Sequence, residues 1–326
     1  MQWPLIKNLP TEFHFRFTKY APVAAVVSGL AVLGTIAVLF TMGLNLGTDF
    51  AGGNVLEVQT PGPMPTAQLR ADMKNFGAED ATVQPFGSDR DAVVKFKLPE
   101  VKGDNDNERV EAIKTKLAQA FPGMTFKRTE VVGPKVSGEL MRSGLIALGA
   151  ALGLMLLYIW FRFPSGLQFG AGAVIAVLHD VVLTIGIMGL LQIEFSMTSI
   201  AALLTVIGYS MNEKVITFDR LRENLRKFKK TPLADIINLS ENERLSRTII
   251  TGSTAILALA GMLFLGGPAL FPLVFAMVFG IFVGTYSSIY VALPIILIWG
   301  INRTDEDAEI IDMGGFKGSK KPKELP

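Results

Sequence analysis

Six long apolar runs constrain the fold of this chain more strongly than any other feature of its sequence. A helix needs about 20 apolar residues to cross the roughly 30 Å hydrocarbon core of a membrane. The runs comprise residues 21–44, 140–161, 167–191, 197–218, 249–265 and 271–299. The first run is longer than the apolar core of a signal peptide, about 7–15 residues, and no small-residue cleavage site closes it. We therefore predict a polytopic α-helical membrane protein with six transmembrane helices, the first of them retained.

The composition agrees with a membrane protein and argues against several other classes. Half of the residues are hydrophobic and 18% are charged, against about 25% in soluble domains. The formal net charge of +2 is too small to indicate nucleic acid as a partner. The chain has no cysteine and only two histidines, His14 and His179, which excludes disulfides, thiolate metal sites and a histidine-rich metal centre. Walker, G-x-S-x-G and H-E-x-x-H patterns are absent from the sequence, so we expect no enzyme active site, cofactor or metal.

The basic residues of the short loops predict the orientation of the chain. Arg16 and Lys19 precede the first run and a cluster of Lys and Arg follows the fourth, whereas the loops at 192–196 and 266–268 contain neither. By the positive-inside rule, both termini lie in the cytoplasm and residues 45–137 lie outside.

The same rule divides the rest of the chain. We expect residues 1–20 to be a cytoplasmic N-terminus and residues 138–301 to contain the second to sixth helices. Residues 219–248 are predicted to form a basic cytoplasmic loop, either solvated or lying on anionic lipid of the inner leaflet. Residues 302–326 are polar and predicted to be a disordered cytoplasmic tail.

The outer segment has a different pattern, in which short strands alternate with amphipathic helices. The predicted strands are residues 54–60, 81–86, 91–98 and 124–132, and the predicted helices are residues 66–76 and 108–121. In the second helix Val110, Ile113, Leu117 and Phe121 recur at helical spacing. The order β-α-β-β-α-β is that of an α+β ferredoxin-like unit. We predict such a domain between the first and second transmembrane helices.

Ionisable residues interrupt two of the apolar runs. Asn212-Glu213-Lys214 interrupts the fourth run and His179-Asp180 lies near the middle of the third. An ionisable side chain at hydrocarbon depth costs about 2.5–3.5 kcal/mol on insertion scales, so such residues usually serve a function. Burial disfavours the charged form of Glu213, which could therefore load a proton on one side of the membrane and release it on the other. The alternative is a static ion pair.

The neighbours of Glu213 are interpreted from helix geometry. Adjacent helix positions point about 100° apart, so Glu213 and Lys214 are not expected to face each other. Lys214 is expected to extend to the cytoplasmic interface. Asp180 cannot reach an interface and should face the bundle interior, paired or protonated, in a proton path or as a static contact between helices; its candidate partners are Asn212 and Glu213. Arg247, at the start of the fifth run, either holds a carboxylate charged or anchors the helix at the interface.

Five separated motifs occur between Gly47 and Thr248. They are Gly47-Thr48-Asp49-Phe50-Ala51-Gly52-Gly53, Val132-Gly133-Pro134-Lys135-Val136, Val177-Leu178-His179-Asp180, Ile207-Gly208-Tyr209-Ser210-Met211-Asn212 continuing into Phe218-Asp219-Arg220-Leu221-Arg222-Glu223-Asn224, and Ser246-Arg247-Thr248. Together they resemble the SecF family, the smaller half of the SecD–SecF protein-export complex, which is similar in fold to the RND transporters. The resemblance implies six membrane helices, as in an RND-like half, and one periplasmic domain.

The resemblance also implies a function and partners. It implies an accessory subunit of the Sec translocase in the bacterial inner membrane, which uses the proton-motive force to complete polypeptide export. The implied partners are SecD, as a heterodimer, the SecYEG translocon, YajC and YidC, the unfolded exported polypeptide and inner-membrane lipids.

The resemblance further implies site residues. A carboxylate after Gly-Tyr-Ser-x-Asn and the arginine of Ser-Arg-Thr are linked to proton conduction in the family, and they fall on Glu213 and Arg247. With Asp180 and Asn212, these are our candidate proton-coupling residues. The usual pattern is Asp followed by a small or polar residue, whereas this chain has Glu213-Lys214. The departure leaves the coupling ion, H⁺ or Na⁺, undecided.

Two other functions remain open at this point. A half-length RND-type exporter of small molecules or lipids would need an apolar pocket in a large outer domain, and residues 45–137 are few for that. A purely structural subunit would hold a channel partner, with Asp180 and Glu213 serving only as contacts between helices.

Overall fold

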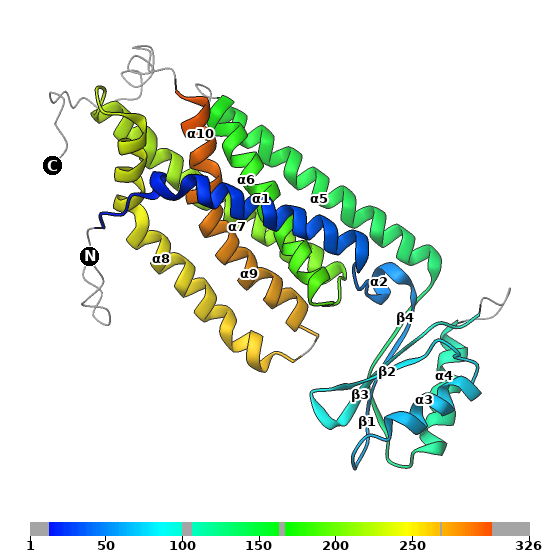
Figure 1. Ribbon diagram of the computed structural model, residues 1–326. Coiled ribbons are helices and arrows are strands. Elements are labelled where there is room, and N and C mark those ends of the chain that lie inside the picture. The colour runs from blue at the N-terminus through cyan, green and yellow to red at the C-terminus, as the bar shows by residue number, and fades with distance from the viewer. Residues whose placement is uncertain (1–12, 100–105, 163–166, 268, 302–326) are drawn as a thin grey trace.

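A helical bundle with a small sheet domain at one end makes up the computed structural model, which describes residues 13–99, 106–162, 167–267 and 269–301 (Figure 1). The bundle contains α1 (Phe17–Thr41), α5 (Pro134–Arg162), α6 (Leu167–Leu190), α7 (Met197–Lys227), α8 (Leu233–Leu265), α9 (Phe271–Ser287), a π-helical turn (Ser288–Ala292) and α10 (Leu293–Trp299). The start of α1 and the end of α10 lie at the end of the bundle away from the sheet. The expected tail, residues 302–326, lies outside the described residues.

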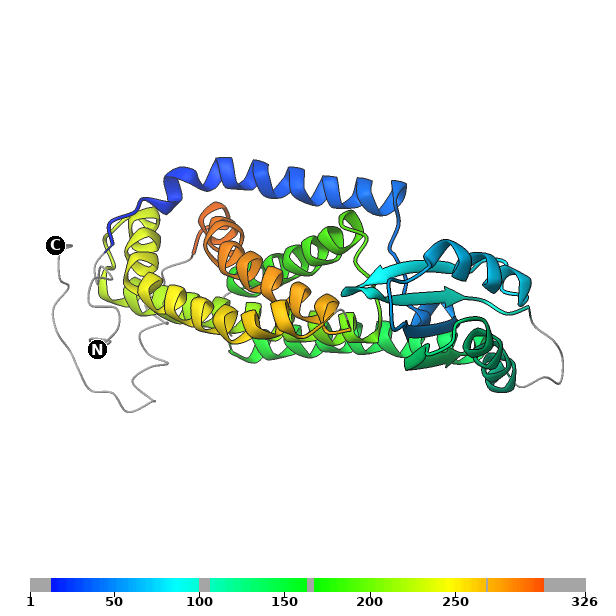
Figure 2. The ribbon, with the colours of Figure 1, turned by 90° about the horizontal axis from the view of Figure 1, so that it is seen from below.

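Five helices within the described ranges are long and apolar enough to cross a membrane. They are Phe17–Thr41, Lys135–Ile159, Gln168–Leu190, Leu233–Leu265 and Phe271–Trp299. The predicted count of six is therefore one too high by this criterion, because α7 does not meet it. The polar residues Asn212, Glu213 and Lys214 lower the apolar content of α7. It nevertheless packs within the bundle against α6, α8 and α9, and Figure 2 shows α1 along one edge of that bundle.

The segment at residues 219–248, expected to be a basic loop, is mostly helix, and its cytoplasmic location stays a prediction. α7 continues to Lys227 and α8 begins at Leu233, directly after Pro232. Both extensions bury apolar side chains on one face, among them Leu221 and Ile236, each 0% exposed. The amphipathic pattern that we assigned to a basic loop therefore continues the two membrane helices beyond their apolar runs.

The sheet domain confirms the predicted order β-α-β-β-α-β. Its elements are β1 (Gly53–Gln59), α3 (Thr66–Asn75), β2 (Thr82–Phe86), β3 (Ser88–Phe96), α4 (Asp106–Ala120) and β4 (Thr125–Val132). All neighbouring strands are antiparallel, in the order β2-β3-β1-β4. Alternate residues of the strands, such as Leu56, Val58 and Val94, pack against Leu69 and Leu117 of the two helices. The domain thus has its own hydrophobic core.

A short helix and two glycines join the bundle to the sheet. α2 (Thr48–Ala51) ends at Gly52, whose φ of 64° and ψ of 171° form a combination that only glycine adopts readily. Gly53 follows with φ of 114°, and a β-carbon there would lie 3.1 Å from the carbonyl oxygen of Phe96. The two glycines therefore allow the turn in the backbone between α2 and β1.

Candidate functional site

Two clusters of ionisable side chains are buried inside the bundle, and both include α7. Their charged members are Asp180 on α6, Glu213 and Lys214 on α7, and Glu241 and Arg244 on α8, none of them more than 4% exposed. Buried charges are tolerated where they are paired and hydrogen-bonded. The geometry of each cluster therefore indicates which charges are compensated.

The first group, the lysine cluster, consists of Asp180, Ser210, Lys214 and Ser287. The Nζ atom of Lys214 donates to Asp180 Oδ2 at 2.9 Å, to Ser210 Oγ at 2.6 Å and to Ser287 Oγ at 2.9 Å. The two hydroxyls in turn donate to Asp180 Oδ2, at 2.5 Å from Ser210 and 2.7 Å from Ser287. Each proton of the ammonium group therefore has an acceptor, and the carboxylate is fully compensated.

The second group, the arginine cluster, consists of Glu213, Glu241, Arg244, Thr248 and Ser288. Arg244 forms a bidentate pair with Glu241, with Nε and Nη2 each 2.8 Å from a carboxylate oxygen. Its Nη1 atom reaches Glu213 Oε2 at 3.1 Å and Thr248 Oγ1 at 2.7 Å. Thr248 donates to Glu213 at 3.1 Å, and Ser288 accepts from Arg244 at 2.8 Å. One guanidinium thus contacts two carboxylates.

The charges of the two clusters do not sum to zero if every group is ionised. Asp180, Glu213 and Glu241 are negative, and Lys214 and Arg244 are positive. Lys214 compensates Asp180, and the bidentate pair compensates Glu241. Glu213 is left with the longer contacts and with the surplus negative charge. An uncompensated charge at this depth is costly, and one added proton would bring the sum of these five charges to zero.

Adjacent residues on two helices connect the clusters. Glu213 and Lys214 point into different clusters, which confirms the expectation that they do not face each other. Ser287 belongs to the lysine cluster and Ser288, the first residue of the π-helical turn, belongs to the arginine cluster. π-Helical turns occur frequently at functional sites. The two clusters are therefore joined by adjacent residues at two places, within α7 and where α9 passes into the π-helical turn.

The structure places Asp180 and Glu213 in the site but gives both of them partners other than the expected ones. Of the two roles predicted for Arg247, the structure does not show the contact with a carboxylate, because Arg247 is exposed and Arg244 contacts Glu213 instead; its role as an anchor at the interface stays a prediction. α8 begins 16 residues earlier than the apolar run from residue 249 indicated (233 against 249). Arg244 therefore lies within a helix, on one face with Glu241 and Thr248.

Two further expectations are also wrong. Asn212 is exposed and does not contact Asp180. Lys214 does not extend to an interface but is 0% exposed. Helical side chains lean towards the N-terminus of their helix, and Lys214 reaches back one turn to Ser210. The spacing Glu241, Arg244, Thr248 was the available signal for the arginine cluster, and the adjacent serines Ser287 and Ser288 gave no signal in an apolar run.

A histidine adjoins the lysine cluster. His179 Nδ1 lies 3.0 Å from Asp180 Oδ1, and its Nε2 atom is buried without a hydrogen-bond partner. Its ring stacks on that of Tyr286, with centroids 6.3 Å apart. In the described part of the chain, no group of three or more His, Cys, Asp or Glu side chains is arranged to hold a metal ion.

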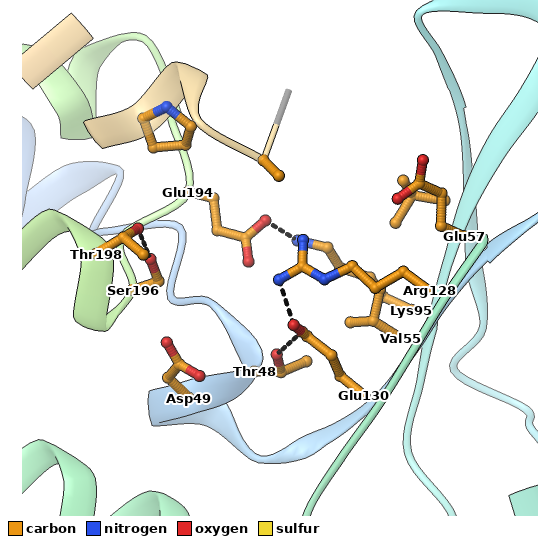
Figure 3. Close-up of a pocket in the computed structure, with 13 residues that line it drawn as sticks. Thr48, Asp49, Val55, Glu57, Lys95, Arg128, Glu130, Glu194, Ser196 and Thr198 are labelled. Carbon is orange, nitrogen blue, oxygen red and sulfur yellow. Dashed lines mark hydrogen bonds and ion pairs between the residues drawn. The ribbon is translucent and has the colours of Figure 1, made fainter. Parts of the chain in front are cut away.

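A polar pocket lies where the sheet domain meets the bundle (Figure 3). Lys95 on β3 forms an ion pair of 2.6 Å with Glu194, in the turn between α6 and α7. Glu130 on β4 accepts a hydrogen bond of 3.4 Å from Thr48 and pairs with Arg128. The first contact connects the sheet to the turn between α6 and α7, the helices that carry Asp180 and Glu213, and the hydrogen bond from Thr48 connects the sheet to α2.

Comparison with known proteins identifies the relatives of this chain. The family described as "Protein export membrane protein SecD/SecF, C-terminal" matches residues 112–302, and the SecD/SecF GG motif matches residues 37–60. The protein translocase subunit SecF of Cereibacter sphaeroides is 40% identical over 304 residues, covering 91% of this chain and 93% of the relative. SecF of Pseudomonas aeruginosa is 39% identical over 287 residues, covering 87% and 90%.

Solved structures show the same relationship. The crystal structure of SecDF from Thermus thermophilus, described as a translocon-associated membrane protein, matches with a TM-score of 0.80 and 34% identity, covering 89% of this chain. A SecDF structure in a super-membrane-facing form matches with a TM-score of 0.62 and 32% identity. This chain spans 39% and 40% of those two chains. The chain therefore belongs to the SecD/SecF family of protein-export membrane proteins, as a relative of the SecF subunits.

Proposed function

We propose that this chain is an accessory subunit of the Sec protein translocase, which uses the proton-motive force to help complete polypeptide export. Relatives at 36–40% identity over most of the chain carry the name protein translocase subunit SecF. The proposal places the chain in the bacterial inner membrane, with its sheet domain outside and both termini in the cytoplasm. It takes SecD as the partner half and the SecYEG translocon as the channel.

The burial and the incomplete pairing of Glu213 support the proton-coupling part of the proposal. Glu213 is 1% exposed and shares Arg244 with Glu241, which holds the guanidinium more closely. A carboxylate with an incomplete share of one cation changes its protonation at lower cost than a fully paired one. We assign Glu213 as the proton-carrying group, Arg244 as the cation that releases it and Thr248 as the hydroxyl between them.

The helix that carries Glu213 also contacts the segment that leads to the outer domain. α7 carries Glu213 near its middle and begins at Met197, whose backbone N–H donates to Asp49 of α2 at 2.9 Å. Gly52-Gly53 and β1 follow α2 directly. One elementary charge moved down the membrane potential yields about 2.3 kcal/mol per 100 mV. Several such steps are enough to bias the orientation of a domain held by partly exposed polar contacts.

The test replaces Glu213 in the complex of this chain with its SecD partner and the translocon. Glu213→Gln keeps the shape and the hydrogen bond from Thr248 but cannot carry the exchangeable proton. In inverted membrane vesicles, we expect Glu213→Gln to abolish the stimulation of preprotein translocation by the proton-motive force and to leave the ATP-driven rate unchanged.

Glu243→Gln is the matched control for this experiment. Glu243 lies on the same helix as Arg244 but is exposed, with contacts to Arg220 and Asn224 at the bundle end. It is expected to retain the full stimulation. The proton-coupling assignment fails if Glu213→Gln translocates as fast as the unmodified protein in energised vesicles.

The complete pairing of Asp180 favours a second candidate, a purely structural subunit. Lys214 compensates the charge of Asp180, and two serine hydroxyls donate to the same carboxylate oxygen. A structural subunit would tolerate Glu213→Gln without loss of stimulation, so the same experiment distinguishes the two. The pocket at the domain junction is lined largely by charged and polar residues such as Asp49, Lys95 and Glu130. This lining does not suit the apolar substrates of a small-molecule or lipid exporter.

A further inference from the structure

The lysine cluster has the composition of a site for a monovalent cation, with an ammonium group at its centre. Four oxygen atoms surround Lys214 Nζ, at distances between 2.6 and 3.4 Å. They are a carboxylate oxygen of Asp180, the hydroxyl and the backbone carbonyl of Ser210, and the hydroxyl of Ser287. Carboxylate, hydroxyl and carbonyl oxygens are the ligands that alkali cations take in membrane proteins.

Hydrogen bonds that do not involve the lysine also connect these oxygens. Ser210 and Ser287 each donate to Asp180 Oδ2, and Asp180 Oδ1 is hydrogen-bonded to His179 Nδ1 at 3.0 Å. The oxygen atoms around Lys214 Nζ belong to residues of α6, α7 and the end of α9. Their arrangement therefore depends on how these helices pack and not on one flexible side chain. Asp180, Ser210 and Ser287 are all 0% exposed. A cation in this position is therefore shielded from water and surrounded by oxygen atoms from three helices.

We propose that the Lys214 ammonium is a tethered cation that occupies an alkali-cation site formed by Asp180, Ser210 and Ser287. Lys214 is then a specificity-determining residue, because it denies the Asp180 centre to Na⁺ and K⁺ and leaves the proton at Glu213 as the ion that moves. Only this consequence for the coupling ion rests on the proposed function. The cation site itself does not.

The test measures cation binding at equilibrium, without transport. Purified protein is compared by thermal unfolding in NaCl, KCl and choline chloride at equal ionic strength. The unmodified protein is expected to unfold at the same temperature in all three salts. Lys214→Ala opens the site, so its Tm is expected to rise by about 2–4 °C for each tenfold increase of Na⁺ or K⁺ above the dissociation constant, and not with choline.

A double variant controls for nonspecific salt effects. Asp180→Asn combined with Lys214→Ala removes the anionic ligand, and its Tm is expected to be the same in the three salts. The proposal is overturned by an alkali-specific shift in the unmodified protein, by none in Lys214→Ala, or by an equal shift in the double variant. The proposal is also overturned if the Tm of Lys214→Ala changes with pH but not with the alkali cation, because a proton and not a metal cation then neutralises Asp180.

A second variant addresses failure to fold. Lys214→Ser also vacates the site and leaves a hydroxyl that can hydrogen-bond within the void. If neither variant is recovered in any of the three salts, the proposal is wrong, because a cation from the buffer would have replaced the missing charge. This experiment and the export assay on Glu213→Gln have separate readouts, so either proposal can fail without the other.

Discussion

At the scale of single residues, the bundle shows how one guanidinium is divided between two carboxylates. Glu241 takes the bidentate position on Arg244, whereas Nη1 of Arg244 donates to Glu213 and to Thr248, and Thr248 donates to Glu213 in turn. Bidentate pairing is the stronger arrangement because both oxygens of the carboxylate are used. Glu213 is therefore the more weakly paired of the two carboxylates. Arg247, three residues further along α8, is exposed and outside this arrangement.

The two arginines provide a direct prediction about stability. Arg244→Gln leaves two buried carboxylates without their cation, so we expect it to lower the free energy of unfolding by about 3–5 kcal/mol. Arg247→Gln changes an exposed side chain and should alter it by about 0.5 kcal/mol at most. Denaturant unfolding of the purified variants in the same detergent measures both. Equal destabilisation by the two substitutions would contradict the assignment of Arg244 as the buried partner.

At the scale of elements, the turn between α6 and α7 connects the site to the outer sheet. Glu194 in this turn binds Lys95 of β3, and the side chains involved are 28% exposed for Lys95 and 35% for Glu194. The amide of Met197, at the start of α7, donates to Asp49. Exposed ion pairs contribute only about 0.2–1 kcal/mol. The contacts that hold the sheet at this end are thus weak enough for a free-energy change of a few kcal/mol to break them.

Charge reversal at this ion pair is expected to change the orientation of the sheet domain. Lys95→Glu places two carboxylates together, so we expect a broader distance distribution between spin labels on the sheet domain and on the bundle. Lys95→Glu combined with Glu194→Lys should restore a narrow distribution. The chain has no native cysteine, so labels at Lys116→Cys on α4 and Leu265→Cys on α8 are specific. An unchanged distribution in the single variant would show that this ion pair does not hold the domain.

At the scale of the whole molecule, several helices have little of their surface covered by the chain itself. The membrane-crossing windows of α1, α5 and α8 are 11%, 6% and 11% buried. Their apolar faces, which include Leu30 and Leu257, need lipid or another protein around them. The SecDF structures that match this chain are more than twice as long as the part it covers.

We therefore expect this chain to assemble with a second membrane subunit. When it is expressed together with the SecD subunit of the same organism, the two should co-purify in a 1:1 complex, because a second set of apolar helices would cover these faces. Native mass spectrometry of the detergent-solubilised sample measures the stoichiometry. A stable monomer that excludes SecD at equimolar concentration would contradict the expected assembly.

Local pattern alone determined the class of this protein and much of its architecture. The length of the apolar runs indicated a membrane bundle, and the alternation of periods two and 3.6 indicated the ferredoxin-like domain, because both depend on neighbouring residues. The cost of burying charge singled out Asp180 and Glu213. Their partners were decided only by the tertiary structure. Whether Arg244 or Arg247 reaches Glu213, and whether Lys214 turns to Asp180, depends on where α8 begins and how α6, α7 and α9 are rotated against one another. Those relations join residues 30 or more positions apart, and no local pattern contains them.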